Sequence, residues 1–399
     1  MNSFPANSPK WLTKKMLQNG GILSFHDFMN IALNDFKNGY YGSGKAKIGI
    51  DGDFVTSPSL SDDFASLLGL QIEEWFTQIS KSFNSKKRFT ILEFGSGNGC
   101  LLSGIIDYFL LKNAELVNNI AFKIIDVNSG MVAKQKIILN KFLEEGIDIS
   151  WTNLSEIEEN SLNGIVIAHE VLDALPVERI QYKKGEIYRQ GVELDEKNET
   201  LNFKNMPLTE KLKKNINDIE NKLGISIPPK NAPEEWTTEL HVNNSLWFEN
   251  IYKRMDNGIL LIIDYAIDSK RYYSAEKNDG TILSYKNQKA FRDLLNNPGD
   301  CDLTCHICSD LLTYQAESKG FESIGFVKQG EALLSLGLAQ KLFEIQSNLK
   351  NDLSKALLKR EAILRLVDPI CLGDFKWFIF KKTDKKGLKI STKCINYLK

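Results

Sequence analysis

The sequence predicts an α/β fold in which helices cover both faces of a mostly parallel sheet. Residues 89–94, 121–127 and 164–170 form short, mainly apolar runs that have the length of buried strands. The first run leads into the glycine turn 95–99 (GSGNG), and helical apolar spacing follows at 101–111. A strand, a glycine turn and a helix in succession make a nucleotide-type pocket at the carboxyl end of such a sheet.

The chain before the first strand is expected to form a helical cap. Two helices are predicted within residues 1–37, and Ser24 can cap the second of them. The polar loop 39–58 is punctuated by glycines, and its length favours a functional position over the glycine turn. A third helix begins at Ser59 or Ser61 and has an apolar face made of Phe64, Leu67, Leu68, Ile72, Trp75 and Phe76.

The rest of the chain completes the sheet and adds an insertion. Residues 178–205 alternate like a β-meander, and the following stretch to 233 is polar, so we interpret this region as a lid or substrate-side module. The run 375–382 alternates and ends in lysines, which predicts an antiparallel edge strand. Further core elements are expected as helices at 131–145, 244–255 and within 331–364, and as strands near 149–152, 258–266 and 321–329.

These elements suggest five consecutive parts. They are an N-terminal helical cap with its loop (1–88), the first part of the core (89–177), the inserted module (178–243), the remainder of the core (244–382) and a loose lysine-rich tail (383–399).

Glu93, two residues before the first glycine, indicates which nucleotide the turn would bind. A carboxylate there would repel a pyrophosphate, but it would attract the sulfonium and the α-amino group of S-adenosylmethionine. Cys100 also stands where the dinucleotide fingerprint needs a third small residue. The pattern E-x-G-x-G-x-G therefore favours S-adenosylmethionine. The alternative is a glycine turn that joins strand to helix without any ligand.

Asp126 ends the second run, where an acidic residue would hydrogen-bond the ribose diol of a nucleotide. Thr152 and Asn153, at the tip of the next strand, could reach the adenine. An aspartate at a strand end is also a common turn residue, and this is the alternative role for Asp126.

Glu170 and Asp173 follow the run 164–170, next to the expected pocket. They lie three residues apart, so they share one face if the segment turns helically. Two carboxylates there could hold a guanidinium in bidentate contact and orient its nucleophilic nitrogen. Alternatively, Glu170 pairs with a local lysine or arginine and Asp173 caps a turn. His169 is expected to be a hydrogen-bonded wall residue rather than a base.

Composition excludes several other classes. The 50 basic and 51 acidic residues give a net charge of −1, and no basic stripe with interleaved aromatics is present, so we expect no nucleic-acid partner. No run of 18 apolar residues and no apolar signal segment is found, which predicts a cytoplasmic protein without membrane insertion. Cys301, Cys305, His306 and Cys308 do not have the spacing of a complete zinc site, so we expect no metal.

The motifs together resemble the MidA-like class I methyltransferases, a family that includes the mitochondrial complex I assembly-factor methyltransferase and bacterial relatives. The matching stretches occur in family order between residues 39 and 382. They are GYYG (39–42), GDFVTSPSLSDDF (52–64), LEFGSGNG (92–99), IIDVN (124–128), HEVLDALPV (169–177), IDYA (263–266), GTILSY (280–285), PGDCDLTCHI (298–307) and CLGDFKWFIF (371–380).

The resemblance implies a Rossmann-like class I methyltransferase sheet of seven strands, with a β/helical insertion after the fourth. It also implies S-adenosylmethionine as methyl donor, symmetric dimethylation of a protein arginine, and a subunit of a respiratory or NADH-dehydrogenase-like complex as substrate. By motif position, the acceptor would face Glu170 and Asp173, and the donor would contact Glu93, Gly95, Gly97, Gly99, Asp126, Val127 and His169.

The chain departs from the family pattern at several positions. Asp126 stands where the family usually has Glu, His169 where it has Asn, and Ala266 where it has Gly. The family often has a histidine soon after GTL, where this chain reads KNQK (286–289). The shorter Asp126 keeps the diol-binding chemistry, whereas the missing histidine leaves the acceptor open.

Two other functions are alternatives to methyl transfer. A methyltransferase fold could act as a non-catalytic assembly chaperone, but intact Glu93, glycine turn and Asp126 argue against a retired site. A nicotinamide-dependent dehydrogenase is disfavoured by Glu93 and Cys100. The sequence leaves the oligomeric state open between a monomer and a homodimer, and we expect the bacterial cytoplasm rather than the mitochondrial matrix.

Overall fold

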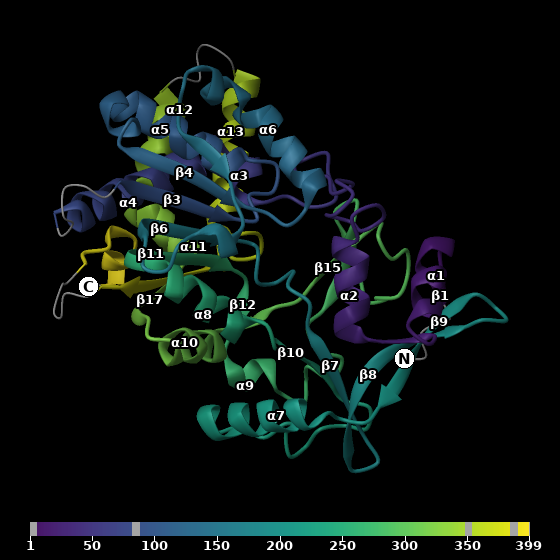
Figure 1. Cartoon of the computed structure of the whole chain (residues 1–399). Coiled ribbons are helices and arrows are strands. Elements are labelled where there is room, and N and C mark those ends of the chain that lie inside the picture. Colours follow the sequence, from purple (N-terminus) through teal and green to yellow (C-terminus); the bar gives the residue numbers. More distant parts are fainter. Residues whose placement is uncertain (1–5, 82–87, 348–352, 384–389, 399) are drawn as a thin grey trace.

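A seven-stranded sheet forms the centre of the larger half of the molecule (Figure 1). The computed structural model describes residues 6–81, 88–347, 353–383 and 390–398, and within them the strand order is β17-β18-β11-β6-β3-β4-β5. The α/β fold is therefore confirmed. The parallel strands are β3 (Phe89–Phe94), β4 (Ile120–Ile125), β5 (Ile149–Trp151), β6 (Leu162–His169) and β11 (Met255–Asp264).

Helices cover both faces of this sheet, which explains why its strands read as continuous apolar runs. One face packs against α4 (Asp62–Ser80), α5 (Cys100–Val117), α6 (Ser129–Glu144), α11 (Gln329–Ser335), α12 (Leu338–Ser347) and α13 (Leu353–Val367). The other face packs against α8 (Asn244–Arg254) and α10 (Ser309–Ser318). All residues of β3 and β6 are buried. Ser61 caps α4 by accepting the N–H of Asp63, as one of the two expected alternatives.

Strand β18 (Lys376–Lys382) is antiparallel as predicted, but the prediction that it forms an edge is wrong. It lies between β11 and β17 (Glu322–Lys328) and pairs antiparallel with both. The prediction assumed that the terminal lysines of this strand face solvent, but both are buried and have partners within the protein. Lys382 Nζ donates to the carbonyl oxygens of Tyr252 and Met255, and Lys381 Nζ pairs with Glu322 at 2.8 Å.

The smaller half is organised by a second sheet that combines the insertion with the N-terminus (Figure 1). Its path is β1 (Ala6–Asn7), β9 (Thr200–Met206), β8 (Glu186–Asp195), β7 (Glu178–Lys183) and β10 (Thr237–Leu240), and β2 (Ile22–Ser24) also pairs with β8. Helices α1 (Lys10–Gln18) and α2 (Phe25–Asn34) share a core with β8 and β9, while α7 (Glu210–Leu223) shares one with β7 and β10. Ser24 caps α2 as expected. The five domain boundaries set out above stay predictions.

Short elements connect the two halves. A three-stranded sheet consists of β13 (Leu283–Lys286), β14 (Lys289–Phe291) and β15 (Asp302–Thr304), and β12 (Ala266–Ile267) pairs with β16 (Ile307–Cys308). The short helix α3 (Ser57–Leu60) follows the loop 48–56, and the short helix α9 (Ser269–Tyr272) follows β12. Because β12 follows β11 after the single residue Tyr265, this junction lies at the carboxyl ends of the parallel strands.

The tail is not loose where the structure describes it. Residues 384–389 and 399 lie outside the described part, but η2 (Lys393–Leu398) packs near α11 and α4. The Cys394 side chain is fully buried, its backbone N–H donates to Gln71 Oε1 at 2.9 Å, and Trp75 Nε1 donates to Thr392 Oγ1 at 3.3 Å. The lysine content concealed the apolar residues Ile390, Cys394 and Ile395, which join the core.

We predict that deleting residues 390–399 lowers the free energy of unfolding by about 2–5 kcal/mol, because it exposes the core around Trp75 and removes the buried Cys394 side chain. Urea titration followed by circular dichroism measures this change. The variant Lys393→Ala, at an exposed position, is the control and should stay within about 0.5 kcal/mol of the parent. An equally stable deletion variant would show that the tail does not contribute to the core.

Candidate active site

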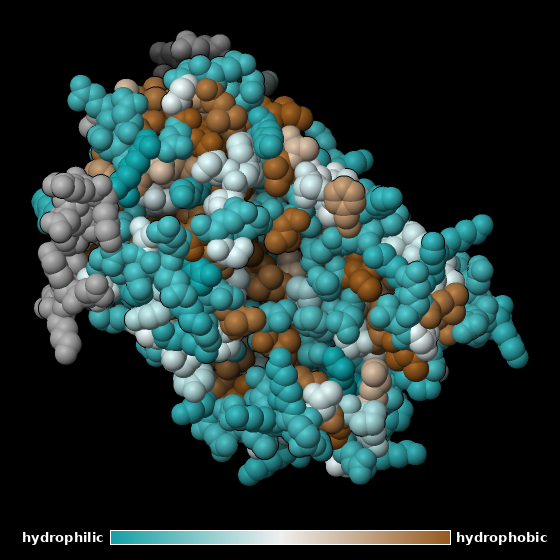
Figure 2. All heavy atoms as spheres, in the orientation of Figure 1, coloured by the Kyte–Doolittle hydropathy of each residue, from teal (hydrophilic) through white to brown (hydrophobic). Residues whose placement is uncertain are grey.

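A cavity of about 860 Å³ lies at the carboxyl ends of β3, β4, β6 and β11. The loop 48–58, the strands β13 and β15 and the segment 365–375 form its other walls. Figure 2 shows the surface hollowed between the two halves of the molecule, with hydrophobic side chains visible in the hollow. This volume is large enough for a nucleotide-sized molecule together with part of a second reactant.

The glycine turn forms one wall of the cavity, as its sequence predicts. Gly95 and Gly97 line it in the left-handed region, with φ of 57° and 54°. A Cβ atom on Gly95 would lie 3.0 Å from Val171 Cγ2, and one on Gly97 would lie 3.1 Å from Ile48 Cδ1. The loop 48–58 therefore does lie against the turn. Gly99 instead caps α5 at φ 93°, close to Gln135, and is not among the residues that line the cavity.

Glu93 lies at the end of β3 with only 2% of its surface exposed, and it lines the cavity. Ser96 Oγ donates to its carboxylate at 2.6 Å. Burial raises the pKa of Glu93 to about 7, although the Ser96 hydrogen bond opposes this shift and the nearby Asp126 adds to it. A cationic ligand stabilises a buried carboxylate of this kind, because the cation compensates the hydration that the charged form loses on burial.

Asp126 follows β4 directly and also lines the cavity. It accepts the backbone N–H of Asn128 at 2.9 Å and Gln135 Nε2 at 2.7 Å. The same Gln135 nitrogen donates to the carbonyl oxygen of Gly97 at 3.1 Å, so one buried amide ties the glycine turn to Asp126. Sequence reasoning did not identify Gln135, because its partners lie far from it in the chain. Val127 lines the cavity mouth and is 81% exposed.

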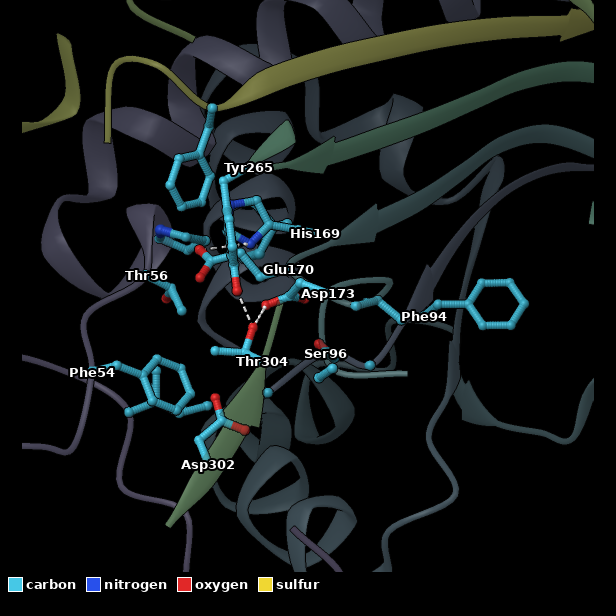
Figure 3. Close-up of a pocket in the computed structure, with 18 of the residues that line it drawn as sticks. Phe54, Thr56, Phe94, Ser96, His169, Glu170, Asp173, Tyr265, Asp302 and Thr304 are labelled. Carbon is cyan, nitrogen blue, oxygen red and sulfur yellow. Dashed lines mark hydrogen bonds and ion pairs between the residues drawn. The ribbon is translucent and has the colours of Figure 1, made fainter. Parts of the chain in front are cut away.

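Glu170 and Asp173 also line the cavity, in the turn after β6 and next to the glycine turn (Figure 3). Glu170 has a φ of 51°, which is unusual for a residue with a side chain and directs the turn into the cavity. Asp264, at the end of β11, fixes this turn by accepting the backbone N–H groups of Leu172 and Asp173 at 3.2 and 3.3 Å. The neighbouring strand thus positions both predicted acceptor residues.

Hydroxyl groups complete the surroundings of Asp173. Thr304 Oγ1 donates to Asp173 Oδ2 at 2.6 Å, and the Tyr265 hydroxyl is hydrogen-bonded to Thr304 (Figure 3). The other oxygen, Asp173 Oδ1, is buried and has no hydrogen-bond partner among the described residues. Burial raises the pKa of Asp173 and holds the pKa of Glu170 well above its usual value, to which the neighbouring Asp173 also contributes.

Asp302 is a third carboxylate on this wall, and the sequence analysis did not single it out. It begins β15, is 5% exposed, and accepts the Tyr41 hydroxyl at 2.9 Å. Burial, with the charge of Asp173 as the next cause, raises its pKa to about 7. Its position inside the stretch PGDCDLTCHI was the available signal, but nothing in that stretch indicated that it returns to the cavity.

These carboxylates have no lysine or arginine partner within the part of the chain that the structure describes. The only ion-pair geometry recorded for Glu170 is with His169 Nδ1 at 3.5 Å, and none is recorded for Glu93, Asp173 or Asp302. Burial lowers the pKa of His169 to about 3, so its ring is neutral and supplies no positive charge. His169 packs edge-on against Phe64, as a wall residue would, but the expected hydrogen bond is not seen at its Nε2, which is buried without a partner among the described residues. The alternative in which Glu170 pairs with a local lysine or arginine is not seen.

The cysteines do not assemble a second site. Cys301, Cys305 and Cys308 are buried free thiols. Among the described residues, no three His, Cys, Asp or Glu side chains are grouped so that they could hold a metal ion. No described helix is long and apolar enough to cross a membrane.

Comparison with known proteins places this arrangement in a family. Residues 67–327 match a family model described as "Putative S-adenosyl-L-methionine-dependent methyltransferase". The chain belongs to this family. It is therefore an S-adenosylmethionine-dependent methyltransferase, as the resemblance of its motifs implied. The residues at the glycine turn fit this donor, because Glu93 offers a carboxylate for its positive charge and Asp126 an acceptor for its ribose hydroxyls.

Individual relatives agree with the family assignment. The chain is 24% identical to "Protein arginine methyltransferase NDUFAF7, mitochondrial" of Bos taurus, covering 90% of this chain and 79% of the bovine protein. It is 25% identical to the Homo sapiens protein of the same name, with coverage of 82% and 72%. A crystal structure from Burkholderia thailandensis bound to S-adenosyl-homocysteine has the same fold, with a TM-score of 0.81 and 23% identity over 96% of this chain and 93% of that one.

We predict that the affinity for S-adenosylmethionine rises with pH through about 7, the pKa of Glu93 in the free protein. A bound cation stabilises the carboxylate and lowers this pKa, so binding releases a proton near neutrality and weakens as the pH falls below 7. Calorimetric titration in buffers of different ionisation enthalpy measures the proton release.

The matched variant Glu93→Gln should bind S-adenosylmethionine about 5- to 30-fold more weakly at pH 8 and should lose most of the pH dependence. Asp107→Asn, at an exposed position paired with Lys141, is the control for a lost surface charge. An unchanged pH profile in Glu93→Gln would show that Glu93 does not sense the charge of the donor.

Proposed function

We propose that this protein transfers the methyl group of S-adenosylmethionine to a guanidinium nitrogen of an arginine in a protein substrate. The observation that supports it is the cluster Glu170, Asp173 and Asp302, which faces the cavity without any cationic partner among the described residues. Buried carboxylates are costly unless they are paired, and a planar guanidinium can pair with two of them at once. The names of the relatives, protein arginine methyltransferases, point to the same acceptor.

The residues of the chain divide into two groups under this proposal. Glu93, Gly95, Gly97, Asp126 and Val127 contact the donor, while Glu170 and Asp173 hold the acceptor. His169 separates the two as a neutral wall, and Gly99 acts indirectly by letting α5 approach Gln135.

Catalysis in this arrangement consists mainly of positioning. Bound S-adenosylmethionine supplies a methyl group already activated by its sulfonium sulfur. Glu170 and Asp173 orient the guanidinium so that one nitrogen lone pair points at the methyl carbon. As the N–C bond forms and the C–S bond breaks, that nitrogen loses a proton, which Glu170 or Asp173 accepts because burial has raised its pKa.

The product and the substrate protein follow from the family resemblance. We propose symmetric dimethylation of the arginine, and subunits of a respiratory or NADH-dehydrogenase-like complex as the first acceptors to test. The bacterial cytoplasm is the proposed compartment and a homodimer the proposed alternative to a monomer. Mass spectrometry of methylarginine in cells with and without the protein tests the substrate, and sedimentation velocity tests the assembly.

Replacing Glu170 by Gln or Asp173 by Asn should lower kcat for arginine methylation by about 100- to 1,000-fold, because each removes a charge that orients and deprotonates the acceptor. The affinity for S-adenosylmethionine should change little, which calorimetry checks. Transfer of labelled methyl groups into host proteins measures the activity, and amino-acid analysis identifies the labelled residue.

The control for this pair is again Asp107→Asn, which should keep full activity. Label on lysine or on another residue would contradict the proposed acceptor. Donor binding without any labelled protein would instead favour the non-catalytic assembly chaperone.

Asp302 predicts how acceptor binding depends on pH. Its pKa of about 7 means that it carries full charge only above neutrality, so acceptor binding should weaken as the pH falls through 7. The variant Asp302→Asn should raise KM for the acceptor by about tenfold and flatten that part of the pH profile, with donor affinity preserved. If KM rose for the donor instead of the acceptor, Asp302 would act on donor binding, which would contradict its proposed place on the acceptor side.

A further inference from the structure

A groove of about 450 Å³ lies beside the cavity, between α9 and the residues that lead into β13. Its lining includes Lys270, Arg271, Lys277 and Arg292. It lies next to the acceptor side of the site, because β12, whose two residues line the cavity, comes just before α9. Thr281, next to the groove residue Gly280, accepts the backbone N–H of His306 at 3.1 Å, and His306 lines the cavity.

The acidic residues of this region are engaged by the protein itself. Asp279 is paired with the buried guanidinium of Arg179 and lies 3.5 Å from Arg292. Asp268 caps α9 by accepting the backbone N–H of Arg271, and Ser274 is hydrogen-bonded to Glu276. These interactions leave the acids of the groove with partners of their own.

The basic residues are different. Lys270, Arg271 and Lys277 form no recorded ion pair within the described part of the chain, and Lys270 and Arg271 are exposed. The positive charges of Lys277 and Arg271 act on His306, which lines the cavity. Burial lowers the pKa of His306 to about 4, and Lys277 and Arg271 are the next causes of that shift. A positive groove therefore adjoins a negative cavity in a chain whose net charge is only −1.

We propose that this groove, formed by Lys270, Arg271 and Lys277, binds acidic residues that flank the acceptor arginine in the protein substrate. The inference rests on the proposed arginine methylation and specifies its substrate class. The arginine enters the acidic cavity, and aspartate or glutamate side chains beside it contact the three free cations. Opposite charges at adjoining sites fix the direction in which the substrate lies, and they disfavour arginines in basic segments.

Short synthetic peptides test the proposal. Each has one central arginine in a glycine–serine background, flanked by glutamates, by glutamines or by lysines. With the full-length protein and saturating S-adenosylmethionine, kcat/KM should be about tenfold higher for the glutamate peptide than for the glutamine peptide, and lowest for the lysine peptide. The preference should shrink as salt is raised, because the contacts are exposed.

The variant Lys270→Glu/Arg271→Glu/Lys277→Glu should reverse the order of the glutamate and lysine peptides while methylating the glutamine peptide as the parent does. The control Lys10→Glu/Lys14→Glu/Lys112→Glu makes the same change of charge at exposed positions on α1 and α5, and it should leave the order unchanged. Retained methylation of the glutamine peptide also shows that the groove variant is folded.

The outcomes separate this inference from the function on which it rests. Equal methylation of all three peptides, or an unchanged preference in the groove variant, would overturn the groove as a docking surface and leave arginine methylation standing. Methylation of none of them, with S-adenosylmethionine bound, would count against the arginine acceptor itself.

Discussion

The site depends on buried carboxylates that have no lysine or arginine partner within the part of the chain that the structure describes. Glu93, Asp173 and Asp302 are each at most 6% exposed, and their recorded partners are hydroxyl and backbone groups. Such groups compensate only part of the hydration that a charged carboxylate loses on burial, so their pKa values rise. A cavity built in this way binds cations preferentially. Both reactants proposed here, a sulfonium donor and a guanidinium acceptor, are cations.

The surrounding structure holds these carboxylates in place. Without these contacts, the carboxylates could move apart or toward solvent and so reduce their mutual repulsion. Asp264 anchors the turn that carries Asp173, and Gln135 links Asp126 to the glycine turn. The second sheet contributes indirectly, because it shares a core with α2, and the chain after α2 brings Tyr41 to Asp302. The insertion and the N-terminus therefore support the proposed acceptor side of the cavity through Asp302, while the parallel sheet carries the proposed donor residues and also Glu170 and Asp173.

The position of most of the proposed donor residues at the cavity could be predicted because these residues are local in sequence. Glu93 and the glycines lie within one strand–turn–helix unit, and Asp126 directly follows the next strand. The position of Glu170 and Asp173 at the cavity was predictable for the same reason. Asp302 and Gln135 were not, because their roles depend on contacts between residues distant in the chain. Local patterns also misassigned β18 as an edge and the tail as loose, since lysine content conceals buried apolar residues and buried, paired lysines.

The most direct test of the account is an experimental structure of the protein with S-adenosylhomocysteine and an arginine-containing substrate peptide. The account predicts a guanidinium bound by Glu170 and Asp173, near Asp302, with its nearest nitrogen facing the sulfur at the glycine turn. A neutral side chain in that place, or an arginine bound away from these carboxylates, would contradict it.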